Sequence, residues 1–157
     1  MKISISDMWA ARPDIWVVTT NAVLDHHNAL VMGKGAALGA KRQFPNVEYA
    51  CGWFLRWWAE CTAGSINNPE SLEYGFRLIM PRFGIFQVKY AWKEPAALDL
   101  LMHSTAMLAY YAREHSWQQI AMNYPGIGAG GLDEAEVEKI VCELPDNVTL
   151  YKLGETP

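Results

Sequence analysis

Two glycine-rich stretches contain the residue types most suited to ligand binding in this sequence. The first is Gly33-Lys34-Gly35, and the second is Pro125-Gly126-Ile127-Gly128-Ala129-Gly130-Gly131. Each stands between a strand-like segment and a run of good helix formers. Glycine lets backbone N–H groups approach a ligand closely, and the start of a helix favours negative charge. Either stretch alone could be an ordinary connection, but together they predict a site for a ligand with phosphates and sugars.

Neither stretch matches a familiar nucleotide motif in its usual context. Gly126, Gly128 and Gly131 have the spacing of the dinucleotide fingerprint, but they lie late in the sequence, whereas that fingerprint opens a nucleotide-binding unit. The spacing of a P-loop is absent around Gly33-Lys34-Gly35. The kind of ligand therefore has to be inferred from other residues.

Polar side chains follow several of the predicted strands. Asp7 follows the first strand, Asn21 the second, and Lys89 comes directly after a later one. Ligands of α/β folds bind outside the carboxyl ends of the strands, where these side chains are expected. Asp133 is the carboxylate beside the second glycine stretch, and it is also the expected N-cap of the helix that follows.

Strand-like and helix-like segments alternate along the chain, which predicts an α/β/α sandwich with helices on both faces of a sheet. Within the second helix, Phe54, Trp57, Trp58 and Cys61 recur at three- and four-residue spacing, which predicts that they face the core. The predicted strands are 2–6, 15–20, 76–80, 84–88, 119–123 and 148–153, and the predicted helices are 35–43, 47–62, 96–114 and 133–142.

The composition is that of a globular protein. The chain has 157 residues, 51% of them hydrophobic and 19% charged, which suits one domain over residues 1–157. The net charge of −4 argues against a non-specific nucleic-acid binder, and residues 133–157 carry seven acidic and two basic side chains. The sequence shows no signal peptide, no membrane-spanning run and three cysteines without metal spacing, so we expect reduced thiols in a cytoplasmic protein.

Five motifs in the same order resemble those of the macrodomain family, the ADP-ribose-binding fold. The resemblance implies a three-layer α/β/α sandwich with a mixed central sheet. It covers most of the chain from Ile3 to Tyr151 and is absent from residues 46–75. The motifs are Ser6-Asp7-Met8, the segment 14–22 ending in Thr20-Asn21-Ala22, the segment 31–38 with 41–45, the segment 86–92 with Pro95, and the segment 125–133.

The resemblance also implies roles for individual residues. Asp7 would accept a hydrogen bond from the adenine amino group, with the Met8 backbone beside it, and Asn21 would bind the distal ribose. The first glycine stretch would close over that ribose and the pyrophosphate, and the second would cradle the phosphates through backbone N–H groups. The implied ligand-binding residues are Asp7, Met8, Asn21, Met32, Gly33, Lys34, Gly35, Pro125, Gly126, Ile127, Gly128, Ala129 and Gly130.

The motif around Lys89, with Trp92 and Pro95 after it, resembles one branch of the family. Members of that branch remove ADP-ribose from acidic protein side chains or, in toxin–antitoxin pairs, from DNA bases. A lysine amine in its neutral form can attack the anomeric carbon of the distal ribose and leave a hydrolysable adduct. The resemblance thus implies catalysis by Lys89, with Asp133 as the candidate acid or base, and requires no metal or other cofactor.

Three functions remain open at this point. The first is hydrolysis of an ADP-ribosyl bond on DNA or protein, and the second is binding of ADP-ribose without turnover. The third is a phosphatase acting on phosphorylated ADP-ribose, which contact of His26 or His27 with the distal ribose would favour. We expect a monomer without a membrane partner. A DNA substrate would require basic side chains around the distal-ribose end, and the candidates are Lys34, Lys41, Arg42, Arg82 and Lys93.

Overall fold

The computed structural model describes residues 1–154 and contains a six-stranded sheet with the strand order β1-β6-β5-β2-β4-β3. Five strands run parallel, and β3 at one edge is antiparallel to β4. The prediction of a mixed central sheet is therefore confirmed. The strands are β1 (Lys2–Ile5), β2 (Ile15–Thr20), β3 (Phe76–Met80), β4 (Phe83–Gln87), β5 (Ile120–Asn123) and β6 (Val148–Lys152).

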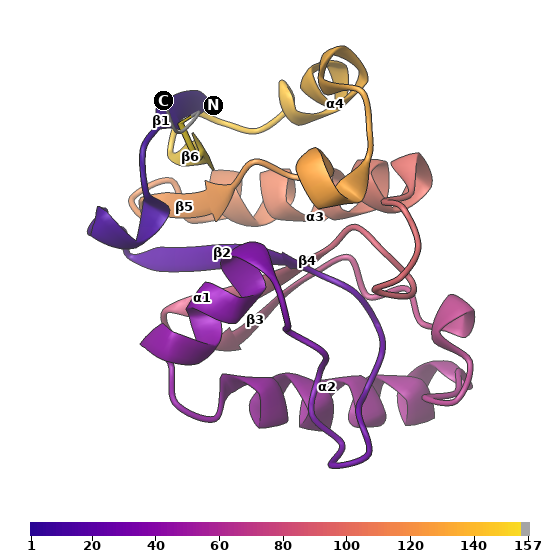
Figure 1. Cartoon of the computed structure of the whole chain (residues 1–157). Helices are drawn as coiled ribbons and strands as arrows, with labels where there is room; N and C mark the ends of the chain where they lie inside the picture. Colours follow the sequence, from indigo (N-terminus) through magenta and orange to yellow (C-terminus); the bar gives the residue numbers. More distant parts are fainter. Residues whose placement is uncertain (155–157) are drawn as a thin grey trace.

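Helices cover both faces of this sheet, which confirms the predicted three-layer sandwich (Figure 1). One face packs against α3 (Leu98–Glu114) and α4 (Glu134–Val141), and the other packs against α1 (Gly35–Gln43) and α2 (Val47–Thr62). Short 3₁₀ turns form in the connections, at η1 (Met8–Ala10), η2 (Pro69–Ser71) and η3 (Gly128–Gly130).

Strand β2 lies inside the sheet and contributes to both apolar cores. Ile15 and Val17 pack toward α3 and α4, whereas Val18 packs toward α1 and α2. Because successive side chains of a strand point to opposite faces, a central strand covered on both sides needs apolar residues at consecutive positions. This explains the β-branched run that ends at Asn21.

The predicted core face of α2 is confirmed for Phe54 and Trp58, which pack against the core, and wrong for Trp57 and Cys61. Trp57 is 47% exposed and Cys61 is also exposed, while Phe54 and Trp58 are half-buried. The fully buried face of the helix carries smaller side chains, while Trp53 and Phe54 line a hollow beside β3. The residues of α2 that enter the core are Val47, Cys51, Leu55 and Ala59.

A close backbone contact explains this orientation of α2. The loop of residues 22–31 crosses α2 at Gly52, where the carbonyl oxygen of Asn28 occupies the space that a side chain would need. The Leu30 N–H also donates to the carbonyl of Glu48, at 2.9 Å. Packing of the loop against Gly52 thus fixes which face of α2 turns toward the sheet.

We expect Gly52→Ala to lower the free energy of unfolding by about 1 to 3 kcal/mol, because its methyl group would displace the Asn28 backbone. Urea denaturation followed by tryptophan fluorescence measures the change. Arg56→Ala, at an exposed position of the same helix, serves as the control and should shift stability by less than about 0.5 kcal/mol. An alanine variant as stable as the wild type would contradict the packing described here.

Residues 1–154 bear on two properties expected from the composition, the lack of a membrane-spanning segment and the state of the cysteines. No helix in this range is both long enough and apolar enough to cross a membrane. All three cysteines are unpaired, with Cys51 buried and the other two exposed. Burial raises the pKa of the Cys51 thiol to about 12, so it is protonated at neutral pH.

Candidate functional site

The chain leaves the neighbouring strands β2 and β5 toward opposite faces of the sheet. After β2 it leads to α1 and α2, and after β5 it leads to η3 and α4 on the other face. Such a switch point between parallel strands opens a crevice outside their carboxyl ends, where α/β folds bind ligands. The structure therefore places its candidate site between the ends of β2 and β5.

The side chain of Asn123 lies where these two strands separate. Its Oδ1 accepts a hydrogen bond from the Thr19 N–H at 2.9 Å, and its Nδ2 donates to Thr19 Oγ1 at 2.9 Å. The backbone pairing between β2 and β5 ends at Val17 and Met122, and beyond it the side-chain amide of Asn123 provides the hydrogen bonds between the two strands. Sequence reasoning missed this role, although an asparagine at a strand end next to a glycine stretch was a visible signal.

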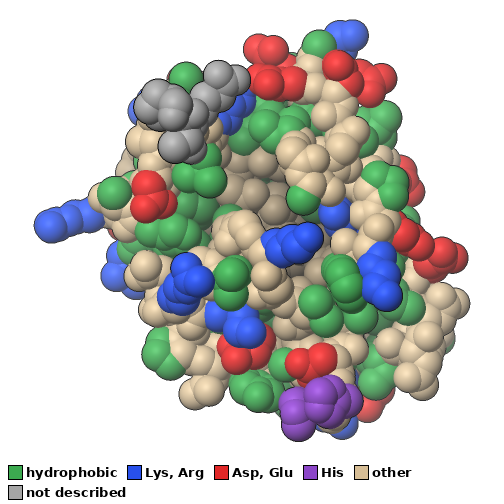
Figure 2. All heavy atoms as spheres, viewed as in Figure 1, with side chains coloured by type: hydrophobic (Ala, Val, Ile, Leu, Met, Phe, Trp, Pro, Cys, Tyr) green, Lys and Arg blue, Asp and Glu red, His purple; other side chains and the backbone are tan. Residues whose placement is uncertain are grey.

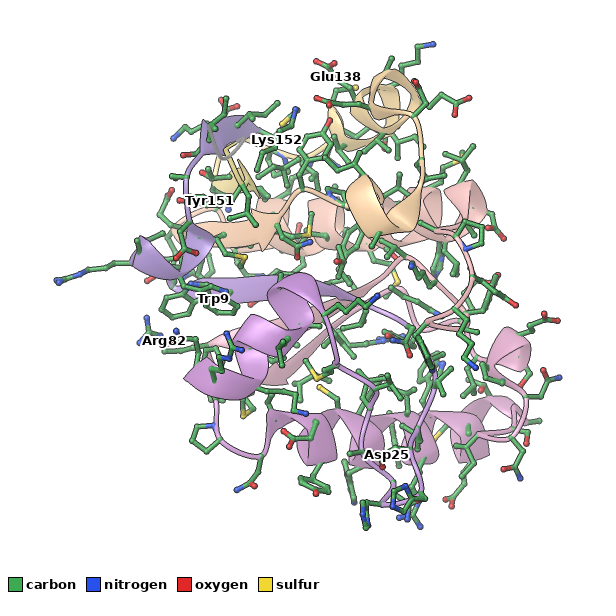
Figure 3. The ribbon with its side chains drawn as sticks, in the orientation of Figure 1. Trp9, Asp25, Arg82, Glu138, Tyr151 and Lys152 are labelled. Atoms are coloured by element: carbon green, nitrogen blue, oxygen red, sulfur yellow. The ribbon has the colours of Figure 1, made fainter. Side chains whose placement is uncertain are left out.

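The polar residues singled out from the sequence come together at this edge. Asp7, Asn21, Lys89 and the second glycine stretch all follow the carboxyl ends of parallel strands, namely β1, β2, β4 and β5. Tyr151, which sequence reasoning did not single out, is the penultimate residue of β6 near the same edge, and it packs on the side of the sheet that also holds Trp9 (Figure 3). The roles of these residues in binding stay predictions.

Lys89 contacts the second glycine stretch directly. Its Nζ donates a hydrogen bond to the carbonyl oxygen of Ala129 at 3.0 Å. Its backbone N–H lies 3.3 Å from the carbonyl of Thr20, so the residue lies beside the end of β2. The half-buried lysine therefore has its backbone beside the end of β2 and its amine at the glycine stretch predicted to hold phosphates.

The second glycine stretch has the backbone geometry and the open space that its predicted role needs. Gly128 begins η3 with φ +63°, a left-handed conformation that favours glycine. No other atom lies within 4 Å of a Cβ built at Gly128 or Gly131. By contrast, a Cβ at Gly126 would lie 2.8 Å from Leu132 Cδ1, and the left-handed backbone at this position, with φ +76°, favours glycine as well.

The first glycine stretch is open in the same way. A Cβ built at Gly33 or Gly35 meets no atom within 4 Å, and Lys34 between them is exposed. Gly35 begins α1, so the N-terminal end of this helix faces the open space. Both glycine stretches therefore leave room for a ligand to approach their backbones, as a phosphate-binding site requires.

Asp7 and Asn21 both bond to the local backbone. Asp7 Oδ1 accepts from the Trp9 N–H at 3.0 Å and caps η1. Asn21 Oδ1 accepts from the Val23 N–H at 2.8 Å, and its Nδ2 donates to the Val31 carbonyl at 3.0 Å. Asn21 therefore holds together the two ends of the loop that leads into the first glycine stretch.

Asp133 is the N-cap of α4, as its position in the sequence predicted. Its Oδ1 accepts hydrogen bonds from the backbone N–H groups of Ala135, at 3.0 Å, and Glu136, at 3.2 Å. These bonds satisfy donors that the first turn of a helix leaves unpaired. This contact gives the carboxylate a structural role, and its role in catalysis stays a prediction.

The two loop histidines lie away from this site. The rings of His26 and His27 are 3.9 Å apart at the tip of the loop, next to Asp25, which lies beside α2 (Figure 3). The Ala29 N–H bond is the main reason why the pKa of the Asp25 carboxyl lies below its usual value. Figure 2 shows histidine side chains at the lower end of the molecule, the end at which Figure 3 labels Asp25, away from the ends of β2 and β5.

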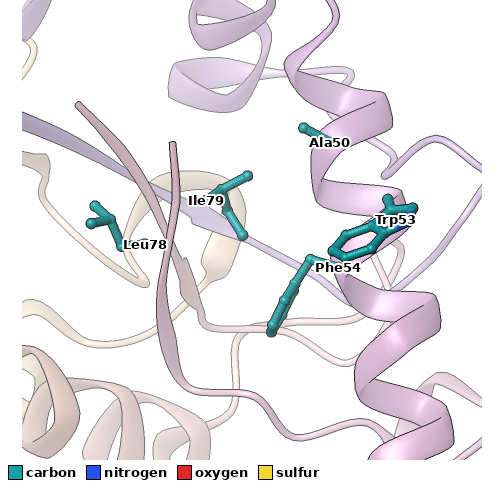
Figure 4. Close-up of a pocket in the computed structure, with 5 residues that line it drawn as sticks. All are labelled: Ala50, Trp53, Phe54, Leu78 and Ile79. Atoms are coloured by element: carbon teal, nitrogen blue, oxygen red, sulfur yellow. The ribbon is translucent and has the colours of Figure 1, made fainter. Parts of the chain in front are cut away.

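An apolar hollow of about 460 Å³ lies elsewhere, between α2 and the edge strand β3 (Figure 4). It has no charged side chain and no glycine stretch, so it lacks the groups that would bind phosphates. Its position at the β3 edge separates it from the switch point between β2 and β5. The residues that line it are Ala50, Trp53, Phe54, Leu78 and Ile79.

The switch point, the two glycine stretches and the mixed six-stranded sheet define an α/β ligand-binding fold, and comparison with solved structures identifies which one. The chain superimposes on the macrodomain of Mycobacterium tuberculosis DarG with a TM-score of 0.71 and 24% identity, over 98% of this chain and 97% of that chain. It superimposes on Thermosipho africanus DarTG in complex with ADP-ribose with a TM-score of 0.69 and 21% identity, over 99% of this chain and 42% of that chain. The chain has the macrodomain fold.

Comparison of sequences finds relatives of the same kind. The chain is 29% identical over 141 residues to the DNA ADP-ribosyl glycohydrolase of Mycobacterium tuberculosis, which covers 85% of this chain. It spans 38% of the length of that curated relative. No family model matches the chain.

Proposed function

We propose that this macrodomain binds ADP-ribose and hydrolyses an ADP-ribosyl bond on DNA, with Lys89 as the nucleophile. The contact between Lys89 Nζ and the Ala129 carbonyl carries the proposal, because it puts an amine at the second glycine stretch. The name of the curated relative, a DNA ADP-ribosyl glycohydrolase, and the ADP-ribose complex of a similar structure support the same ligand. A domain that only binds ADP-ribose has no chemical use for this amine.

The reaction follows from the position of the Lys89 amine at the second glycine stretch, with the Lys89 backbone beside the end of β2. With the phosphates on the backbone of residues 126–130, the distal ribose lies toward Asn21, and its anomeric carbon faces Lys89. The neutral amine forms a C–N bond to this carbon, and the bond to the DNA base breaks with its electron pair on the base. Water then hydrolyses the lysine adduct, which releases ADP-ribose and restores the amine.

Asp133 is the carboxylate we propose for proton transfer in this reaction. It stands at the end of the second glycine stretch, and both of its N-cap bonds use Oδ1. It could deliver the proton that the leaving base needs, or remove one from the attacking water.

We expect Asp133→Asn to keep the stability of the protein and to lower turnover by about 10²-fold, since asparagine caps helices as well as aspartate but transfers no proton. Asp133→Ala should lower turnover similarly and also cost about 1 kcal/mol of stability through loss of the cap. Release of ADP-ribose and urea denaturation separate the two effects. Full activity in Asp133→Asn would leave the residue with its structural role alone.

Basic side chains at the site favour a nucleic-acid substrate over an acidic protein. Lys34 is exposed within the first glycine stretch and Lys93 is exposed four residues after Lys89, whereas Lys41 and Arg42 are exposed in the last turn of α1, at the end away from Gly35. Lys and Arg side chains gather in the middle of the face shown in Figure 2, while most acidic ones lie toward its rim. Positive charge near the distal ribose would attract the phosphates on either side of a modified base.

The test is to give the protein a single-stranded DNA and an acidic protein, each carrying ADP-ribose, and to measure free ADP-ribose. Calorimetry with ADP-ribose measures binding separately. Release from DNA alone supports the proposal, and release from the protein substrate alone would reassign the substrate. Binding without release would make the domain a non-catalytic reader, and absence of binding would overturn the assignment of both glycine stretches.

A further inference from the structure

A buried tyrosine lies beneath the end of β2, although it belongs to the segment just before β3. Tyr74 has no exposed surface, and its hydroxyl donates to the carbonyl of Asn21 at 2.5 Å. The same hydroxyl lies 2.6 Å from Thr20 Oγ1. Because a phenol has one hydrogen and Asn21 receives it, the Thr20 hydroxyl must donate to Tyr74. Burial raises the pKa of Tyr74, which keeps the phenol a neutral donor.

The buried side chain of Gln87 fixes the segment that carries Tyr74. Gln87 Oε1 accepts from the backbone N–H groups of Tyr74, at 2.7 Å, and Gly75, at 3.3 Å. Its Nε2 donates to the carbonyl of Leu72 at 2.7 Å and lies 3.4 Å from the carbonyl of Lys89. The position of Tyr74 is therefore set relative to β4, the strand that leads to Lys89.

Thr20 and Asn21 connect this network to Lys89 and to the loop that leads into the first glycine stretch. The Thr20 carbonyl accepts from Val88 N–H at 3.0 Å and lies 3.3 Å from Lys89 N–H. The Asn21 side chain binds Val23 and Val31, and Val31 lies two residues before Gly33. Movement at the end of β2 would therefore shift both the lysine and the loop that leads into the first glycine stretch.

We propose that Tyr74 is a positioning residue for the reaction: its hydroxyl fixes the end of β2, and thereby aligns Asn21 and Lys89 with the distal ribose. This inference rests on the function proposed above. Tyr74 itself is enclosed by the protein and touches no substrate. Its effect is on alignment, because an error of about 1 Å in the position of a reacting group can cost about 10²-fold in rate.

Tyr74→Phe tests the proposal, since it removes the hydroxyl and keeps the ring. Tyr111→Phe is the matched control. Tyr111 belongs to α3, away from the site, and its hydroxyl bonds to Gln118 Oε1 at 2.9 Å. Tyr74→Phe loses the hydrogen bonds with Asn21 and Thr20, and Tyr111→Phe loses the one with Gln118, so both should lower the urea midpoint. We expect kcat to fall about tenfold or more in Tyr74→Phe alone, with KM and the Kd for ADP-ribose within about threefold of the wild type.

A fall in kcat without a matching change in KM, absent from Tyr111→Phe, supports positioning when it is measured without urea at a temperature where both variants are folded. A loss of stability alone leaves the kcat of the folded protein unchanged. Equal kcat values in the two variants would overturn the role of Tyr74 and leave the proposed function intact. A wild-type protein that binds ADP-ribose but releases none from either substrate would instead overturn the proposed function, and the role of Tyr74 with it. The wild-type assay therefore separates the two failures before any variant is compared.

Discussion

Lys89→Ala is expected to lose release of ADP-ribose by at least about 10³-fold, because no other group in the proposed reaction replaces the missing nucleophile. The affinity for free ADP-ribose should change by less than about threefold, since the phosphates are held by backbone N–H groups that the substitution leaves in place. Single-turnover release from ADP-ribosylated DNA measures the first quantity, and calorimetry measures the second. This split between binding and chemistry distinguishes a nucleophile from a residue that only binds.

A second variant separates nucleophilicity from positive charge. Lys89→Arg keeps a cationic donor for the Ala129 carbonyl, but a guanidinium stays protonated and cannot attack carbon. It should therefore be as inactive as Lys89→Ala. Lys139→Ala, at an exposed lysine on α4, is the matched control and should keep full activity. Activity in Lys89→Arg close to that of the wild type would show that the residue acts through its charge.

Gly33→Leu is expected to weaken binding of ADP-ribose about tenfold or more, a loss of about 1.4 kcal/mol. The backbone of Gly33 lies outside the left-handed region, and no protein atom lies within 4 Å of a Cβ built there. The added side chain would therefore project into the space proposed for the ligand without disturbing the fold. Calorimetry measures the loss of affinity, and urea denaturation should show unchanged stability.

Ala106→Leu provides the comparison for this prediction. It adds the same side chain at an exposed position of α3, away from both glycine stretches. It should leave affinity and stability unchanged. If Gly33→Leu binds ADP-ribose as tightly as Ala106→Leu does, the ligand does not approach the first glycine stretch, and the assignment of that stretch would be wrong.

The sequence alone determined the elements and their order. Every predicted strand and helix is present, and the bounds of α1, α2, β2 and β3 agree with the prediction to the residue. These features depend on local properties: β-branched runs favour strands, and proline or glycine ends them. The same local signals located both glycine stretches and the cap at Asp133.

The face that a helix turns toward its core was less predictable. The aromatic residues of α2 have the right spacing for a core face, yet Trp57 is exposed, Phe54 and Trp58 are only partly buried, and smaller residues form the fully buried face. The deciding contact is between Gly52 and the Asn28 backbone, which lie in different elements. Spacing along a helix shows which side chains share a face, but it cannot show how closely another segment approaches.

The site itself was decided by the tertiary structure. Lys89 and Ala129 are distant in sequence, and they meet only because β4, β2 and β5 are neighbours that all run in the same direction. Asn123, Tyr74 and Gln87 carry no local signature of their roles, since each bonds to backbone groups of another strand or loop. The sequence thus determined which residues could do the chemistry, and strand order and buried hydrogen bonds decided which of them share one crevice.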